Sequence, residues 1–128
     1  MTGIMVIEDD LDLRQLYQEL LTHAGFRQIS FGDGGSALSA LSTLKPLPQL
    51  IILDFMLPEM NGQQFLEKLS QLTQLASIPV VIVSALGPED PAIVAASHHP
   101  LVKQVFNKQA LSDGRLVTWL KNFSSPNS

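Results

Sequence analysis

Three acidic side chains follow two short apolar runs, in a pattern that suggests metal or phosphate chemistry. Glu8 and Asp9 come directly after the apolar run 4–7, and Asp54 comes directly after the run 50–53. If the two runs are neighbouring parallel strands, the carboxylates meet at one edge of the sheet, where two unit charges about 4 Å apart repel by roughly 4 kcal/mol at an effective dielectric near 20. The cluster therefore predicts a bound cation. Oxygen ligands with few protein carboxylates favour Mg²⁺ over a dedicated Ca²⁺ cage.

A simpler interpretation of each acid, as a solvated loop residue or a helix cap, also has to be weighed. Asp10 or Asp12 can cap a helix that begins after the first apolar run, because aspartate is a good N-cap and acids suit a helix N-terminus. One acid on its own is explained in this way. Three carboxylates that converge on one sheet edge are not.

Two further polar residues follow the next apolar runs of the chain. Ser84 ends the run that starts at Ile78, and Lys108 comes shortly after the run 101–106. A hydroxyl and an ammonium group beside the acids can neutralise the oxygens of a transferring phosphoryl group. Asp54 is ionised at neutral pH and needs no general base to act as a nucleophile. Lys103 is a second candidate for the phosphate lysine, although it precedes an apolar pair.

Apolar runs alternate along the chain with segments of helical period, which indicates an α/β protein. Strands are expected at 4–7, 28–31, 50–53, 78–83 and 101–106, and apolar residues at helical spacing lie between them and over 116–123. Right-handed crossovers then predict a flavodoxin-like (βα)5 three-layer sandwich with a five-stranded parallel sheet in the order 2-1-3-4-5. Ligands of such sheets bind beyond the carboxyl ends of the strands, near the switch point between strands one and three.

Composition limits the other functions that the chain can have. The 128 residues fit one domain, expected over 1–123 and followed by a disordered tail at 124–128. Lys and Arg number 8 against 12 Asp and Glu, a net charge of -4 without a basic run, so direct nucleic-acid binding is not expected. The chain has no cysteine and no apolar run near the length of a membrane span, which is about 18 residues. We expect a cytoplasmic protein that has no membrane partner.

These residues together resemble the response-regulator receiver family of two-component signalling, the CheY-like domains. The resemblance rests on the Glu8-Asp9-Asp10 run, on Asp54 with Pro and Gly four and eight residues later, and on the order and spacing of Ser84 and Lys108. It covers nearly the whole chain.

The resemblance implies a set of roles for these residues. An Mg²⁺ ion would be held by three carboxylates and one backbone carbonyl, those of Glu8, Asp9, Asp54 and Met56. Asp54 would take a phosphoryl group from a histidine kinase or a histidine phosphotransfer protein, and Ser84 and Lys108 would contact the phosphate. Such a domain is a signalling domain that catalyses only its own phosphorylation and dephosphorylation.

Two positions depart from the family pattern. Gln109 follows Lys108, where the family usually has proline, so the cis peptide common there is not expected. Val105 stands where the family usually has Tyr or Phe, and the neighbouring Phe106 is expected to point to the opposite face of its strand. We therefore expect phosphorylation to change the surface of residues 101–120 only modestly. The His98-His99 pair is interpreted as a polar loop and not as a metal site.

Other classes of protein fit the sequence less well. A flavodoxin needs a phosphate loop after strand one, where this chain has acids, and a haloacid-dehalogenase-type phosphatase needs a second Asp where Met56 stands. A phosphorylation-independent receiver-like module, which signals by protein-protein docking alone, stays open. The sequence also leaves open the kinase, the output partner, and whether the domain stands alone or belongs to a longer protein.

Overall fold

The computed structural model describes residues 3–72, 75 and 77–124, over which strands and helices alternate. In chain order the elements are β1 (Gly3–Ile7), α1 (Leu11–His23), β2 (Arg27–Phe31), α2 (Gly34–Leu41), β3 (Leu50–Leu53), α3 (Gly62–Gln71), β4 (Val80–Ser84), α4 (Pro91–Ser97), β5 (Val102–Asn107), α5 (Gln109–Ser112) and α6 (Arg115–Ser124). The strands form one parallel sheet in the order β2-β1-β3-β4-β5. The predicted flavodoxin-like topology is confirmed.

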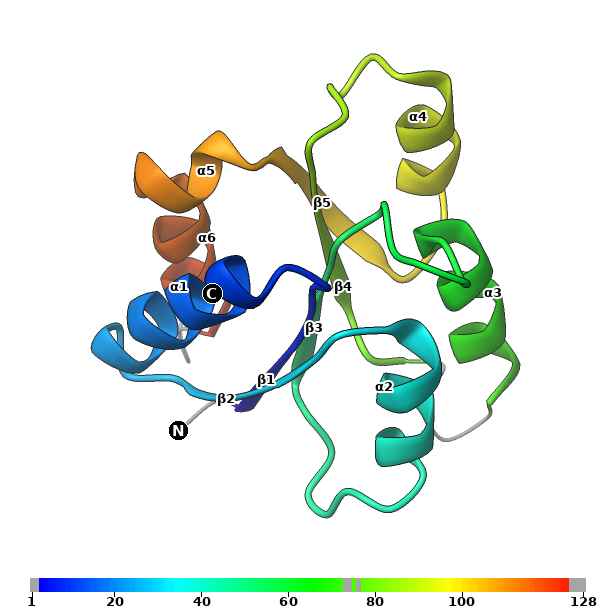
Figure 1. Ribbon diagram of the computed structural model, residues 1–128, viewed down its shortest axis with the longest axis horizontal. Helices are drawn as coiled ribbons and strands as arrows, with labels where there is room; N and C mark the ends of the chain where they lie inside the picture. Colours follow the sequence, from blue (N-terminus) through cyan, green and yellow to red (C-terminus); the bar gives the residue numbers. More distant parts are fainter. Residues whose placement is uncertain (1–2, 73–74, 76, 125–128) are drawn as a thin grey trace.

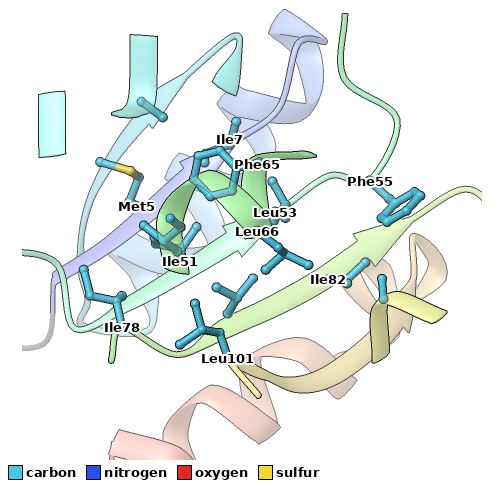
Figure 2. Close-up of a cluster of buried hydrophobic side chains, with 14 of the residues drawn as sticks. Met5, Ile7, Ile51, Leu53, Phe55, Phe65, Leu66, Ile78, Ile82 and Leu101 are labelled. Atoms are coloured by element: carbon cyan, nitrogen blue, oxygen red, sulfur yellow. The ribbon is translucent and has the colours of Figure 1, made fainter. Parts of the chain in front are cut away.

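Alternate residues of the central strands point to opposite faces of the sheet and build two separate cores. Met5, Ile51 and Ile82 pack with side chains of α2, α3 and α4 on one face. Val6, Ile52 and Val83 pack with side chains of α1, α5 and α6 on the other. Figure 1 shows the two groups of helices on either side of the sheet, and Figure 2 shows the first of the two cores. Because helices cover both faces, the central strands are apolar up to Ser84 at the end of β4.

The ends of several elements differ from those expected. β4 begins at Val80 and not at Ile78, because Pro79 has no N–H for the strand ladder, and Ile78 is buried beside it as part of the first core. α2 ends at Leu41, well before the first proline that follows it, Pro46. At the end of the helix the hydroxyls of Ser42 and Thr43 donate to the carbonyls of Ser39 and Ala40. α5 was not expected at all.

The last helix extends slightly beyond the expected range of 116–123. α6 includes Ser124, and residues 125–128 of the expected tail lie outside the described part of the chain. The boundary of the domain at residue 123 stays a prediction. Among the described residues no helix is long and apolar enough to span a membrane.

Gly62, the first residue of α3, allows the helix to approach the loop that carries Asp54. Its N–H donates to the carbonyl of Phe55 at 2.9 Å. A Cβ at this position would lie 2.6 Å from the Phe55 ring and 3.0 Å from the Phe55 Cα, closer than a side chain tolerates. Phe55 directly follows Asp54, so the absence of a side chain at Gly62 helps to hold the loop in place.

Gly62→Ala should therefore destabilise the protein by about 1 to 3 kcal/mol, the usual cost of an overpacked buried contact. Urea unfolding measures this change. Gly35→Ala is the matched control, because a Cβ at Gly35 in α2 meets only a carboxylate oxygen of Asp33 at an ordinary 3.5 Å. If the two variants were equally stable, the close approach of Gly62 to Phe55 would not be a constraint.

Candidate functional site

The register of β1 with β3 places two of the predicted acids side by side. Ile7 pairs with Leu53, so Glu8 and Asp54 leave the sheet at the same level. The N–H of Asp54 donates to the Ile7 carbonyl at 3.0 Å, which extends the ladder past the end of β3. Both carboxylates are buried, with 1% of Glu8 and 3% of Asp54 exposed. Burial of two like charges requires compensation by positive charge.

Asp9 completes a group of three carboxylates that could hold a metal ion. One ligand oxygen from each of Glu8, Asp9 and Asp54 lies within 4.8 Å of the others, and Asp9 is open to solvent. Glu8 Oε1 is buried and accepts no hydrogen bond among the described residues, although the ammonium of Lys108 lies 3.2 Å from it in an ion pair. An oxygen-rich, partly open group of three carboxylates, two of them buried, fits a hard divalent cation such as Mg²⁺. Asp10 instead caps α1, because its side chain accepts from the N–H groups of Asp12 and Leu13.

Lys108 supplies positive charge to the two buried acids. Its Nζ lies 3.2 Å from Glu8 Oε1 and 3.4 Å from Asp54 Oδ2. The other carboxylate oxygen, Asp54 Oδ1, accepts from the N–H of Met56 at 3.1 Å. Lys103 does not reach the site, because it is exposed on β5 and its ammonium donates to the carbonyl of Pro100. Of the two lysines considered, only Lys108 is brought to the acids.

Ser84 reaches the same edge at the end of β4. It is fully buried, pairs in register with Asn107 at the end of β5, and its Oγ accepts from the N–H of Leu86 at 3.1 Å. Because that bond uses only a lone pair, the hydroxyl proton remains available to an acceptor. The histidine pair lies elsewhere, after α4, where the Nδ1 of His99 accepts from the N–H of Leu101.

The ionisation of Glu8 reflects its burial and its neighbours. Burial raises its pKa from an ordinary 4.5 to about 7, and the negative charge of Asp54 adds to the rise. A hydrogen bond from the N–H of Asp10 and the charge of Lys108 act in the opposite direction without cancelling it. For Lys108, partial burial lowers the pKa, but Asp54 and Glu8 outweigh it and raise the pKa above its ordinary value.

The raised pKa of Glu8 predicts how the stability of the metal-free protein depends on pH. The folded state binds this proton more tightly than the unfolded state, so the stability linked to it is complete below about pH 4.5 and is lost as the pH rises through about 7. At about 1.4 kcal/mol for each pKa unit, the loss is on the order of 3 kcal/mol. Urea unfolding in EDTA should show this loss for the wild type relative to Glu8→Gln, since other titrating groups are common to both proteins. A difference between them that stays constant over this range would mean that Glu8 titrates normally.

Val105, which departs from the family pattern, and its neighbour Phe106 point to opposite faces of β5, as alternation along a strand predicts. Val105 packs against the first core, and Phe106 packs against the second, on the opposite face of β5. The expectation for Phe106 is confirmed. Among the described residues the only cis peptide precedes Pro46, so the Lys108–Gln109 bond is trans, as expected.

Comparison with known proteins agrees with this geometry. A family model for the response regulator receiver domain matches residues 4–115. The chain belongs to this family. It is 36% identical over 90 residues to the phosphate regulon transcriptional regulatory protein PhoB of Escherichia coli K12, an alignment that covers 70% of this chain and 38% of PhoB. The chain thus spans less than half the length of this curated relative.

Solved structures of receivers superpose closely on the chain. The phosphorylated cyanobacterial phytochrome response regulator RcpA is 25% identical with a TM-score of 0.84, over 99% of this chain and 96% of RcpA. The Mn²⁺-bound response regulator Rcp1 is 28% identical with a TM-score of 0.79, over 96% and 94% of the two chains. This chain is therefore a receiver domain of two-component signalling, a class of domain that accepts phosphoryl groups.

One residue that the sequence patterns did not single out also belongs to this edge of the sheet. Asn107 pairs in register with Ser84 and directly precedes Lys108, and its side-chain oxygen accepts two hydrogen bonds. An asparagine directly after the predicted strand 101–106 is the one signal in the sequence that could have drawn attention to it.

Proposed function

We propose that this receiver domain takes a phosphoryl group on Asp54 from a histidine kinase or a histidine phosphotransfer protein, in an Mg²⁺-dependent reaction. The observation that carries the proposal is the placement of Lys108 Nζ 3.4 Å from Asp54 Oδ2 and 3.2 Å from the buried Glu8 Oε1. An ammonium held there neutralises charge on the nucleophile and on the incoming phosphoryl group. A cytoplasmic location is part of the proposal.

The transfer needs no proton removal at Asp54. A carboxylate oxygen of Asp54 attacks phosphorus, the P–N bond to the donor imidazole breaks, and the electron pair of that bond returns to the ring nitrogen. The product is an acyl phosphate at Asp54, which water later hydrolyses. Lys108 stabilises the phosphoryl oxygens by its charge, and Ser84 turns its hydroxyl proton towards one of them, because such catalysis depends mainly on positioning and charge.

The metal site supports the same reaction. The residues that would hold Mg²⁺ are Glu8, Asp9 and Asp54 through carboxylates and Met56 through its backbone carbonyl. Mg²⁺ supplies positive charge that offsets both the three acids and the phosphoryl oxygens. The Rcp1 structure is Mn²⁺-bound and the RcpA structure is phosphorylated, which gives the proposal precedent in relatives.

Incubation with acetyl phosphate and Mg²⁺, followed by intact mass measurement, tests the proposal. We expect the mass to increase by one phosphoryl group. If EDTA is added before acetyl phosphate, we expect no increase. If the folded, Mg²⁺-bound protein gained no mass, the phosphorylation-independent docking module would be the better description. The proposed activity of the domain is limited to its own phosphorylation and dephosphorylation.

A further inference from the structure

Asn107 connects the phosphate-binding edge of the sheet to the last helix. It is the last residue of β5, lies in register with Ser84 and directly precedes Lys108. Its Oδ1 accepts from the backbone N–H of Gln109 at 3.1 Å and from Nη2 of Arg115 at 3.2 Å. One amide oxygen thus ties the turn around Lys108 to the first residue of α6.

Arg115 is itself held in place for this contact. Its Nε donates to Asp113 Oδ2 at 2.8 Å, and its backbone N–H donates to Asp113 Oδ1 at 3.0 Å. The hydrogen bond to its backbone N–H and the pairing with its guanidinium lower the pKa of Asp113, which keeps that carboxylate charged. The guanidinium, about half exposed, therefore contacts Asp113 through Nε and Asn107 through Nη2.

The turn at Lys108 needs such support. Lys108 occupies the N-cap position of α5 but makes no side-chain capping bond, because an ammonium group cannot accept from the helix N–H groups; its side chain extends to Glu8 and Asp54. α5 has only four residues, so it is a weak anchor on its own. The bond from Gln109 to Asn107 requires a backbone N–H after Lys108, which a proline would lack.

We propose that Asn107 and Arg115 are positioning residues, which hold the backbone of Lys108 so that its ammonium stays between Glu8 and Asp54. The role of the Lys108 ammonium towards phosphate rests on the proposed function. The placement of the ammonium between Glu8 and Asp54 does not depend on that function. The same bonds link the site to α6, so a change at Lys108 is transmitted to the start of that helix through Arg115.

Acylation of lysine amines, followed by peptide mass spectrometry, measures the placement of Lys108 without any phosphorylation. Asn107→Ala loses both hydrogen bonds to Oδ1, and Arg115→Met loses one of them. In both variants Lys108 should react about threefold faster or more relative to Lys121, because the turn that places its ammonium between the two carboxylates is less constrained. Gln109→Ala keeps the backbone N–H that donates to Asn107, so Lys108 should react in this variant as it does in the wild type. Lys121→Met controls for the loss of a positive charge from α6. In this variant the acylation rate of Lys108 is compared with that of Lys103, and it should match the wild type.

The rate of phosphorylation by acetyl phosphate then shows whether the two residues act through Lys108. Asn107→Ala should slow the reaction about threefold to tenfold in the wild-type background and have no further effect in a Lys108→Met background. Unchanged acylation of Lys108 in Asn107→Ala, or an equal slowing in both backgrounds, would overturn the proposal. Faster acylation in a protein that accepts no phosphate would keep the positioning role and reject the proposed phosphorylation instead.

Discussion

Replacement of Asp54 by asparagine should abolish phosphorylation while leaving the domain folded. The amide side chain would keep the size of the carboxylate and an oxygen to accept the N–H of Met56, a bond of 3.1 Å in the wild type. It would lose the anionic oxygen, and a neutral amide is a poor nucleophile. Labelling by acetyl phosphate, followed by intact mass, should therefore fall from a full phosphoryl addition to none.

The matched control for Asp54→Asn is Asp12→Asn, which makes the same chemical change at an exposed position in the first turn of α1. This control should be labelled at the wild-type rate. Thermal unfolding checks that both variants remain folded. Undiminished labelling of Asp54→Asn would mean that another residue accepts the phosphoryl group.

Joint neutralisation of Glu8 and Asp9, as Glu8→Gln with Asp9→Asn, should remove Mg²⁺ binding. Loss of a residue that only orients a metal ligand already costs 10- to 100-fold in affinity, so loss of two direct ligands should cost at least about 100-fold. In the absence of metal the double variant should be more stable by about 1 to 3 kcal/mol, because repulsion among acids within 4.8 Å of one another is relieved. The partial offset is the ion pair of Glu8 with Lys108, which the variant gives up.

Isothermal titration with Mg²⁺ and urea unfolding in EDTA measure the two effects. The control pair, Asp12→Asn with Glu19→Gln, removes the same two charges from exposed positions of α1. It should leave Mg²⁺ affinity close to that of the wild type. Unchanged affinity in the Glu8 and Asp9 double variant would show that these acids are not the metal ligands.

The sheet and the acid cluster were predictable because the apolar strand patterns and the handedness of the crossovers indicate the same topology. Buried parallel strands such as β3 are apolar at each position, which makes them easy to find, and the topology follows from the handedness of the crossovers. Once strand order is known, the residues that follow β1 and β3 must meet. Glu8, Asp9 and Asp54 are therefore placed together by the amino-acid pattern alone.

The details that were not predictable depend on contacts between distant residues. The alternation of apolar residues does not show that Lys108 pairs with Glu8 as well as with Asp54, because that contact depends on the path of the chain after β5. α5 is too short to give a helical period. Asn107 was missed for the same reason, since its partner Arg115 lies beyond that short helix.

That phosphorylation changes the surface of residues 101–120 only modestly stays a prediction. The packing of Val105 and Phe106 gives a physical reason for it. Val105 is partly buried against the first core, where a β-branched side chain has little freedom to rotate. Phe106 lies on the other face of β5 and cannot take its place without a shift of register. Asn107 and Arg115 add a hydrogen-bonded connection from this edge of the sheet to the start of α6.

The most direct test of the central claim is to locate the phosphoryl group on the chain. Reduction of the acetyl phosphate-treated protein with borohydride converts an aspartyl phosphate to homoserine, and peptide mass spectrometry then identifies the modified residue. We predict homoserine at position 54 alone, dependent on Mg²⁺ and absent from Asp54→Asn. Homoserine at another acid, such as Asp9 or Asp10, or no modification of the folded and Mg²⁺-bound protein, would contradict the assignment of Asp54 as the phosphoryl acceptor.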